Sequence, residues 1–166
     1  QNQMGHKIKI NPFMGVMGMP PPEAGQHDTA PPRIWGGNID CKELVSGTTL
    51  YLPIPVDGAL FSVGDGHAAQ GDGEVSVQAI ECPMEKAELT LTLHEDMTLD
   101  APIARIDGAW LTFGFHENLN QAAYMALDNM VNLISCSAST SRVAVSTAVS
   151  ASHIPSGFLP NRYSKS

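Results

Sequence analysis

Two stretches of the chain alternate apolar and polar residues. In residues 74–80 the positions Val75, Val77 and Ala79 fall on one side, and in residues 87–93 leucine alternates with threonine. Successive side chains of a β-strand point to opposite faces of the sheet, so this spacing is typical of a strand with one buried face. The pattern therefore predicts a half-buried strand in each stretch.

Short apolar runs predict further strands. Residues 50–56 and 59–63 flank an Asp-Gly pair, the strongest short signal for a β-hairpin turn. Pro53 and Pro55 lack backbone N–H donors, so the first arm is expected at a sheet edge. Residues 110–115 form another candidate strand.

One stretch has helical periodicity. Between residues 117 and 134, apolar residues recur every three or four positions, which predicts an amphipathic helix with Asn118 as its N-cap. The fold expected from all of these elements is a mainly β, antiparallel sandwich or barrel-like domain with one amphipathic helix.

The end of the chain differs in composition. Residues 1–134 contain every acidic group and most of the large apolar residues, whereas residues 135–166 are rich in serine, alanine and valine. Small side chains bury little apolar area, so the tail is expected to be weakly packed or disordered. A single β-rich domain over residues 1–134 is predicted, followed by this divergent tail.

Charge and cysteine content narrow the functional classes. The 166 residues include 17 acidic and 9 basic ones, for a net charge of -8, which disfavours binding to nucleic acid or to anionic membranes. No apolar run is long enough to span a bilayer. The three cysteines show no C-x-x-C spacing, which fits reduced thiols in the cytoplasm better than a disulfide framework.

The densest group of chemically active side chains lies in residues 64–74, Gly-Asp-Gly-His-Ala-Ala-Gln-Gly-Asp-Gly-Glu. Asp65 and His67 are two residues apart and would share one face of an extended segment, as would Asp72 and Glu74. Carboxylate and imidazole groups are ligands that zinc and similar divalent ions accept. A glycine-rich hairpin loop with solvated acidic side chains explains the same residues without any chemistry.

A second polar group is found in residues 36–40, Gly-Gly-Asn-Ile-Asp. Asn38 could orient an amide or donate to an oxyanion, and Asp40 could bind a metal ion or orient a histidine. Ordinary turn formation is the simpler interpretation. The neighbouring Cys41 is a candidate nucleophile, although a buried free thiol is the more common role for such a cysteine.

Three segments in this order carry a resemblance to a known family. They are Pro-Phe-Met-Gly-Val-Met-Gly at residues 12–18, the residues 36–40, and the long motif at residues 64–74. The runs at residues 49–56 and 58–63 match as well. From residue 12 to about residue 134 the chain resembles the acetamidase/formamidase family.

This resemblance implies an oligomeric, β-rich enzyme that hydrolyses short aliphatic amides to a carboxylate and ammonia. It also implies a divalent metal ion, with zinc as the expected ion. Carried over by position, Asp40, Asp65 and His67 become the candidate metal ligands. The expected partners are a small amide substrate and further copies of the same chain.

The same resemblance implies Glu74 as the candidate general base and Asn38 as the group that orients the amide or donates to an oxyanion. Asp72 is included among the catalytic candidates. A carboxylate in this position would transfer a proton to the departing amine. Family members have additional sequence before the residue 12 segment, and their ends differ from this serine-rich tail. The resemblance therefore also allows a truncated, non-catalytic member that only binds a metal ion or a small ligand.

Overall fold

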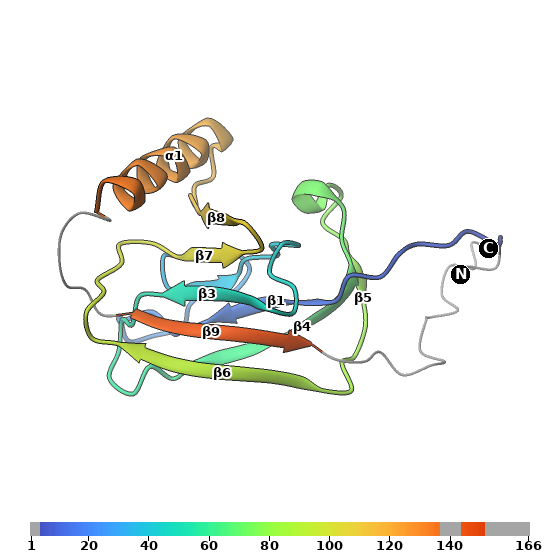
Figure 1. Cartoon of the computed structure of the whole chain (residues 1–166), viewed down its shortest axis with the longest axis horizontal. Helices are drawn as coiled ribbons and strands as arrows, with labels where there is room; N and C mark the ends of the chain where they lie inside the picture. The colour runs from blue at the N-terminus through green and yellow to red at the C-terminus, as the bar shows by residue number, and fades with distance from the viewer. Residues whose placement is uncertain (1–3, 137–143, 152–166) are drawn as a thin grey trace.

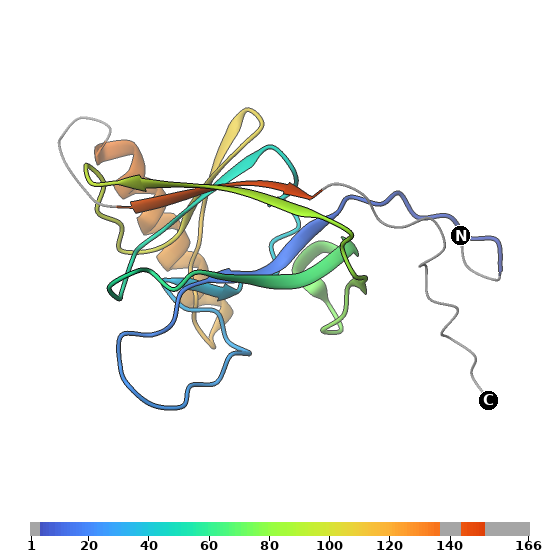
Figure 2. The same cartoon turned by 90° about the horizontal axis from the view of Figure 1, so that it is seen from below.

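The computed structural model describes residues 4–136 and 144–151. Within these residues the chain forms two antiparallel β-sheets that face each other, with one helix beside them (Figures 1 and 2). The strand orders are β2-β1-β4-β5 and β6-β9-β3-β7-β8. This arrangement confirms the predicted mainly antiparallel class with a single helix.

The four-stranded sheet is built around its two longest strands. β1 pairs with both β2 and β4, and β4 pairs along its other edge with the short β5. The pairing of β4 with β5 is irregular between His67 and Ala69. The strands are β1 (Phe13–Gly18), β2 (Gly36–Asn38), β4 (Ser62–Ala69) and β5 (Ile80–Glu81).

The five-stranded sheet contains β3 (Thr48–Leu52), β6 (Ala87–His94), β7 (Ile103–Ile106), β8 (Ala109–Thr112) and β9 (Ala144–Ala151). β9 lies between β3 and β6, so part of the serine-rich tail is a strand of this sheet. Residues 137–143 and 152–166 lie outside the described residues. Weak packing of the tail as a whole therefore stays a prediction.

The apolar core fills the space between the two sheets. Met17 of β1 and Leu50 and Leu52 of β3 are fully buried, and they belong to one cluster with Leu44. In β3 the buried positions alternate with half-buried ones, as expected for a strand that faces the core on one side. In β1 nearly every residue is buried, because this strand has a neighbour on each side and packs against the opposite sheet.

The predicted helix is confirmed as α1 (Leu119–Cys136). The side chain of Asn118 accepts hydrogen bonds from the backbone N–H groups of Asn120 and Gln121, at 3.0 and 3.2 Å, so it is the N-cap. Two side-chain hydrogen bonds connect the helix to the strand region: Thr112 donates to the carbonyl of Ala126, and Asn129 to a carbonyl just beyond β8. In the described part of the chain, no helix is long and apolar enough to cross a membrane.

The predicted strand over residues 74–80 is wrong. Most of this stretch is a turn that follows a 3-10 helix, η1 (Asp72–Glu74), and only its last residue enters β5. Val75 and Val77 are 82% and 87% exposed, and Val77 has a left-handed φ of 58°. The alternating pattern failed because these residues reverse the chain between β4 and β5, where the valines have no facing sheet to cover them.

The hairpin predicted over residues 50–63 is also wrong. Its two arms become β3 and β4, which belong to different sheets. β3 pairs with β7 and β9 instead, and β4 pairs with β1. The segment with Pro53 and Pro55 crosses from one sheet to the other, since it lacks the N–H groups that a hairpin ladder needs.

Strand predictions elsewhere fared better. The alternating stretch at residues 87–93 is β6, confirmed with one added residue. The stretch at residues 110–115 is confirmed only in its first part, which forms β8. β7 and β8 are joined by a tight turn in which Gly108 has a φ of 69°, a conformation that glycine adopts without steric strain.

Candidate metal and catalytic centre

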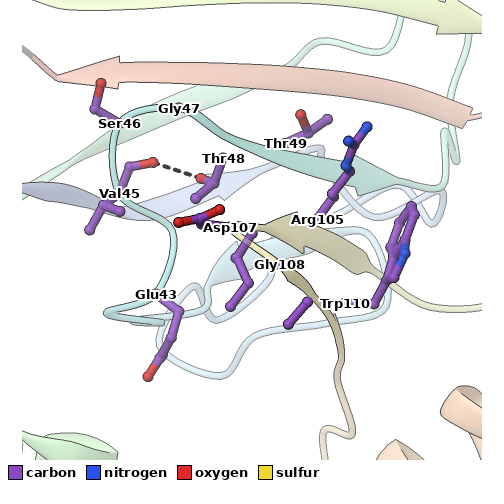
Figure 3. Close-up of a pocket in the computed structure, with 12 residues that line it drawn as sticks. Glu43, Val45, Ser46, Gly47, Thr48, Thr49, Arg105, Asp107, Gly108 and Trp110 are labelled. Atoms are coloured by element: carbon purple, nitrogen blue, oxygen red, sulfur yellow. Dashed lines mark hydrogen bonds between the residues drawn. The ribbon is translucent and has the colours of Figure 1, made fainter.

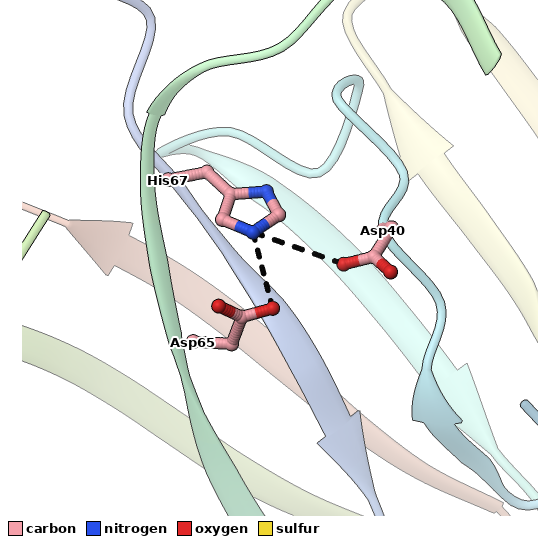
Figure 4. Close-up of side chains that lie close together, drawn as sticks. All are labelled: Asp40, Asp65 and His67. Carbon is pink, nitrogen blue, oxygen red and sulfur yellow. Dashed lines mark ion pairs between the residues drawn. The ribbon is translucent and has the colours of Figure 1, made fainter. Parts of the chain in front are cut away.

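The fold brings together the three residues predicted as metal ligands (Figure 4). Asp65 and His67 lie on β4, and Asp40 comes two residues after β2 ends. His67 Nε2 is 3.1 Å from Asp65 Oδ2 and 3.9 Å from Asp40 Oδ1. One possible ligand atom from each residue lies within 4.8 Å of the other two, which is close enough for one ion to contact all three.

The imidazole of His67 is held in place on several sides. The residue is only 1% exposed, and its ring meets the ring of Phe13 edge to face, with centroids 5.0 Å apart. Nδ1 lies 2.9 Å from Oε1 of Gln70. The second ring nitrogen, Nε2, is the one that faces the two carboxylates (Figure 4).

Gly15 of β1 lies against the same three side chains. A Cβ atom at this position would be 2.5 Å from Asp65 Oδ2, 2.6 Å from Asp40 Oδ1 and 3.0 Å from the His67 ring. Any side chain here would occupy the space between the donor atoms. Glycine therefore keeps open the volume on which the three candidate ligands converge.

Both carboxylates come from strained backbone. Asp40 has a φ of 48° and Asp65 a φ of 58°, in the left-handed region that most residues other than glycine avoid. A hydrogen bond of 3.0 Å from the N–H of Asp40 to the carbonyl of Gly15 fixes one of these conformations against β1. Such conformations are concentrated at functional sites, where the surrounding structure maintains them.

The carboxylates also interact electrostatically. Burial raises the pKa of Asp40 to about 6, and the negative charges of Glu74 and Asp65 act in the same direction. His67 opposes this rise, and a hydrogen bond between the Asp40 and Glu74 carboxyl groups adds to it. Two acidic groups this close are difficult to ionise together unless a cation compensates them.

The donor set fits a divalent cation. Asp40 Oδ1 is buried and has no hydrogen-bond partner among the described residues, although a buried carboxylate oxygen normally has one. The open space left by Gly15 adjoins this oxygen. Two carboxylates and one imidazole are a ligand combination that zinc and related ions accept.

The three predicted catalytic residues lie in different surroundings. Glu74 is half-buried beside Asp40, with a φ of 45°. Asp72 is on the solvent side, with its carboxylate paired with Lys42. The side-chain amide of Asn38 donates to the carbonyl of Ala30 at 3.0 Å.

Cys41 is a poor nucleophile in this structure. Burial raises the pKa of its thiol to about 12, and the sulfur donates to a Glu43 carboxylate oxygen at 3.3 Å. Nucleophilic cysteines have a lowered pKa because the thiolate is the reactive form. The environment of Cys41 therefore favours the structural role over the catalytic one.

A hollow of about 830 Å³ opens beside the centre. Asp65 and Asn38 line it, and the loop between β1 and β2 contributes apolar wall residues such as Pro20 and Trp35. This volume lies within the usual range for small-molecule sites. Asp65 is the most exposed of the three candidate ligands, and it connects the hollow with the buried imidazole.

A second hollow, of about 870 Å³, lies at the ends of β3, β7 and β8 (Figure 3). Its polar lining includes Glu43, Arg105 and Asp107, and Trp110 stands at its side. None of the three candidate ligands is among its described lining residues. The first hollow is therefore the one associated with the candidate centre.

Two residues at the centre were missed by sequence reasoning. Gly15 was part of the family-like segment at residues 12–18, but its role depends on contacts across three strands. Gln70 lies within the long motif, and its side chain connects His67 to the backbone of Asp40. The sequence shows only that Gln70 follows His67 by three residues, and this spacing does not predict a contact between their side chains.

The fold and centre define a mainly β protein in which a buried histidine and two carboxylates adjoin a small-molecule hollow. A profile of the acetamidase/formamidase family matches residues 22–124, which is more than half of the chain. The chain therefore belongs to the acetamidase/formamidase family.

Individual relatives agree with this assignment. Over 48 residues the chain is 48% identical to an acetamidase from Mycolicibacterium smegmatis and to a formamidase from Methylophilus methylotrophus; the match covers 29% of this chain and 12% of each relative. The crystal structure of an acetamidase from Bacillus halodurans superposes with a TM-score of 0.64 and 25% identity. That match covers 89% of this chain and 57% of the solved one, so the chain spans little more than half the length of the solved relative.

Proposed function

We propose that this chain hydrolyses linear amides, with formamide and acetamide as substrates, at the centre formed by Asp40, Asp65 and His67. The observation that carries the proposal is the convergence of these three side chains on the space left by Gly15. Membership of a family whose relatives are named acetamidase and formamidase supports the same reaction. The adjoining hollow gives a small amide access to Asp65.

A divalent metal ion, with zinc as the expected ion, is part of this proposal. The unpartnered oxygen of Asp40 and the mixed carboxylate and imidazole donors support it. Asp40, Asp65 and His67 would hold such an ion, which would supply Lewis-acid chemistry toward the amide carbonyl and toward water. The chain itself supplies the ligands, the open volume and the proton transfer.

Glu74 is the proposed general base. Its carboxyl group lies beside Asp40 and is half-buried, so it can accept a proton from the attacking water and deliver it to the departing amine. The carbon–nitrogen bond breaks as that nitrogen is protonated, and the products are a carboxylate and ammonia. No covalent intermediate with the protein is required, in agreement with the high pKa of Cys41.

Asn38 is proposed to contact substrate rather than the metal ion. It lines the hollow, and the hydrogen bond to the Ala30 carbonyl orients its amide group. Asp72 takes no step in this scheme, because its carboxylate is exposed and paired with Lys42.

The test measures bound metal and ammonia release from formamide and acetamide for the wild type and Glu74→Gln. We expect both proteins to bind zinc, and only the wild type to release ammonia. Glu88→Gln is the matched control, since Glu88 is on β6 and pairs with the exposed Lys86. A zinc-loaded wild type that releases no ammonia from either amide contradicts the proposal.

A second candidate function is a non-catalytic family member that binds a metal ion or a small ligand. It is favoured by one observation: the side chain of Asp72, one of the predicted catalytic residues, is exposed and paired with Lys42. Zinc binding without ammonia release is the result expected from this alternative.

Association of several copies, predicted from the family resemblance, is supported by the apolar side chains exposed on α1, among them Leu127 and Val131.

A further inference from the structure

A single side chain connects two of the three candidate ligands. Gln70 lies just after β4, and its Oε1 is 2.9 Å from Nδ1 of His67. Its Nε2 donates a hydrogen bond of 2.5 Å to the backbone carbonyl of Asp40, which is 30 residues away in sequence. Gln70 thus contacts the ring of one ligand and the main chain of another.

The orientation of the Gln70 amide follows from these partners. The carbonyl of Asp40 can only accept, so the side-chain NH₂ of Gln70 must point toward it. The amide oxygen then faces Nδ1 of His67, and an oxygen that can only accept requires a hydrogen on that nitrogen. His67 therefore carries a hydrogen on Nδ1, so Nε2, the ring nitrogen that faces the two carboxylates, is the one available to a cation.

We propose that Gln70 is the positioning residue of this centre: it fixes the Nδ1–H tautomer and the ring orientation of His67, and it ties the Asp40 backbone to the same position. The functional meaning of this role rests on the metal centre proposed above. Partners of this kind orient metal-binding histidines and influence metal affinity without touching the ion.

The burial of His67 makes this role necessary. The ring is 1% exposed, so water cannot supply the missing acceptor for Nδ1. Without Gln70, the alternative tautomer would place its hydrogen on Nε2 and donate to Asp65 Oδ2, 3.1 Å away. In that tautomer Nε2 has no lone pair for a cation, so the identity of residue 70 decides whether the nitrogen that faces the open volume carries a hydrogen.

The experiment compares the wild type with Gln70→Met and Gln70→Glu. Methionine has a similar size but cannot make either hydrogen bond, whereas glutamate keeps an acceptor for Nδ1 and loses the donor to Asp40. Gln121→Met is the control, because Gln121 is exposed on α1. The imidazole nitrogens of the metal-free proteins are observed at pH 8 by long-range 1H–15N NMR, and zinc affinity is measured by calorimetry.

We expect the wild type and Gln70→Glu to carry a hydrogen on Nδ1 of His67, and Gln70→Met to carry its only ring hydrogen on Nε2. Zinc affinity should fall about 10- to 100-fold in Gln70→Met, the usual effect of losing an outer-shell partner. Gln70→Glu, which keeps the acceptor for Nδ1 but loses the donor to Asp40, should recover only part of that affinity, and Gln121→Met should match the wild type.

A wild type with no hydrogen on Nδ1 overturns the inference, and so does a Gln70→Met protein that keeps a hydrogen on Nδ1. If Gln70→Met does not fold, the tautomers of the wild type and Gln70→Glu still decide the question. If the tautomer responds as expected but no protein binds zinc, the positioning role stands and the metal centre fails. If ammonia release alone fails, only the proposed hydrolysis is contradicted.

Discussion

The four-stranded sheet and helix α1 differ in the regularity of their apolar pattern and in the burial of their side chains. Residues 12–18 and 64–74 have little regular periodicity and many glycines, yet they contribute fully buried residues such as Met17 and His67. Helix α1 has the clearest periodicity in the chain, yet Leu127 and Val131 are 59% and 54% exposed. The most regular sequence is thus among the least buried parts of the described structure.

The difference shows what periodicity measures. A repeat of apolar residues shows that a helix or strand has one apolar face. It does not show whether another part of the chain covers that face. The helix packs near β8 through its small residues, with Gly114 against the backbone of Ala122, and leaves its larger apolar residues open. β1 is buried at nearly every position and so shows no apolar repeat, whereas β4 is buried only around His67 and Ala68.

The largest expected effect compares one leucine from each environment. Leu50→Ala, at a fully buried position of β3, should lower the free energy of unfolding by about 2–5 kcal/mol. Leu127→Ala on α1 should change it by less than about 0.5 kcal/mol, because the side chain is mostly exposed. Urea denaturation measures both, and similar losses would show that α1 is covered in solution, for example by another copy of the chain.

The next prediction concerns the open volume at the centre. Gly15→Ala places a methyl group within 2.6 Å of carboxylate oxygens of Asp40 and Asp65, so zinc affinity should fall about 100-fold or more, beyond the usual outer-shell effect. Gly64→Ala is the control, since a Cβ there meets nothing within 4 Å. Calorimetry measures both affinities. Equal zinc binding by the two variants would place the ion elsewhere.

A smaller effect is expected from the charge on Asp40. Its pKa in the folded chain is about 6, above the ordinary value of 3.8, so the folded state holds this proton more tightly than the unfolded state. The stabilisation is present below pH 4 and is lost as the pH rises through 6. Glu74, Asp65 and His67 are the titratable groups that face it.

Asp40→Asn removes this ionisation. In metal-free protein the variant should gain about 1 kcal/mol of stability relative to the wild type between pH 4 and pH 7.5, a figure reduced for solvent screening. Urea denaturation at both pH values in the presence of a chelator provides the measurement. If the stability difference between Asp40→Asn and the wild type is the same at both pH values, the pKa of Asp40 is not raised in the folded chain.

The smallest effect is expected at Cys41. Cys41→Ser should leave ammonia release and zinc affinity within about twofold of the wild type, because a thiol with a pKa of about 12 is not the reacting group. Serine also keeps a donor toward Glu43. Loss of ammonia release in this variant, with Glu74→Gln still active, would reverse the assignment of the catalytic residue.

The sequence was most informative about features that depend on residues close together along the chain. The helix and its Asn118 cap, strand β6, and the shared location of Asp65 and His67 all follow from local spacing. The position of Asp40 beside them was expected only through the family resemblance, because it depends on how β1 and β2 pair.

The remaining features depend on contacts between distant segments. Nothing local distinguishes Gly15 from other glycines, since its role arises where β1 meets β4 and the residues after β2. The valines at 75 and 77 alternate as in a strand, but the chain needs a turn there to return to β5. For Gln70, the partner on the Asp40 backbone is 30 residues away.

The separation of Asp40 from Asp65 and His67 along the chain also affects how a cation would influence folding. An unfolded chain does not hold these three side chains near one another, so a bound ion would belong to the native state alone. Native-state binding stabilises a protein by mass action, by about 2.7 kcal/mol when the free ion is at 100 times its dissociation constant. Thermal denaturation at increasing zinc concentration would therefore report on the assembly of the β1–β4 region, even in a variant that has lost all turnover.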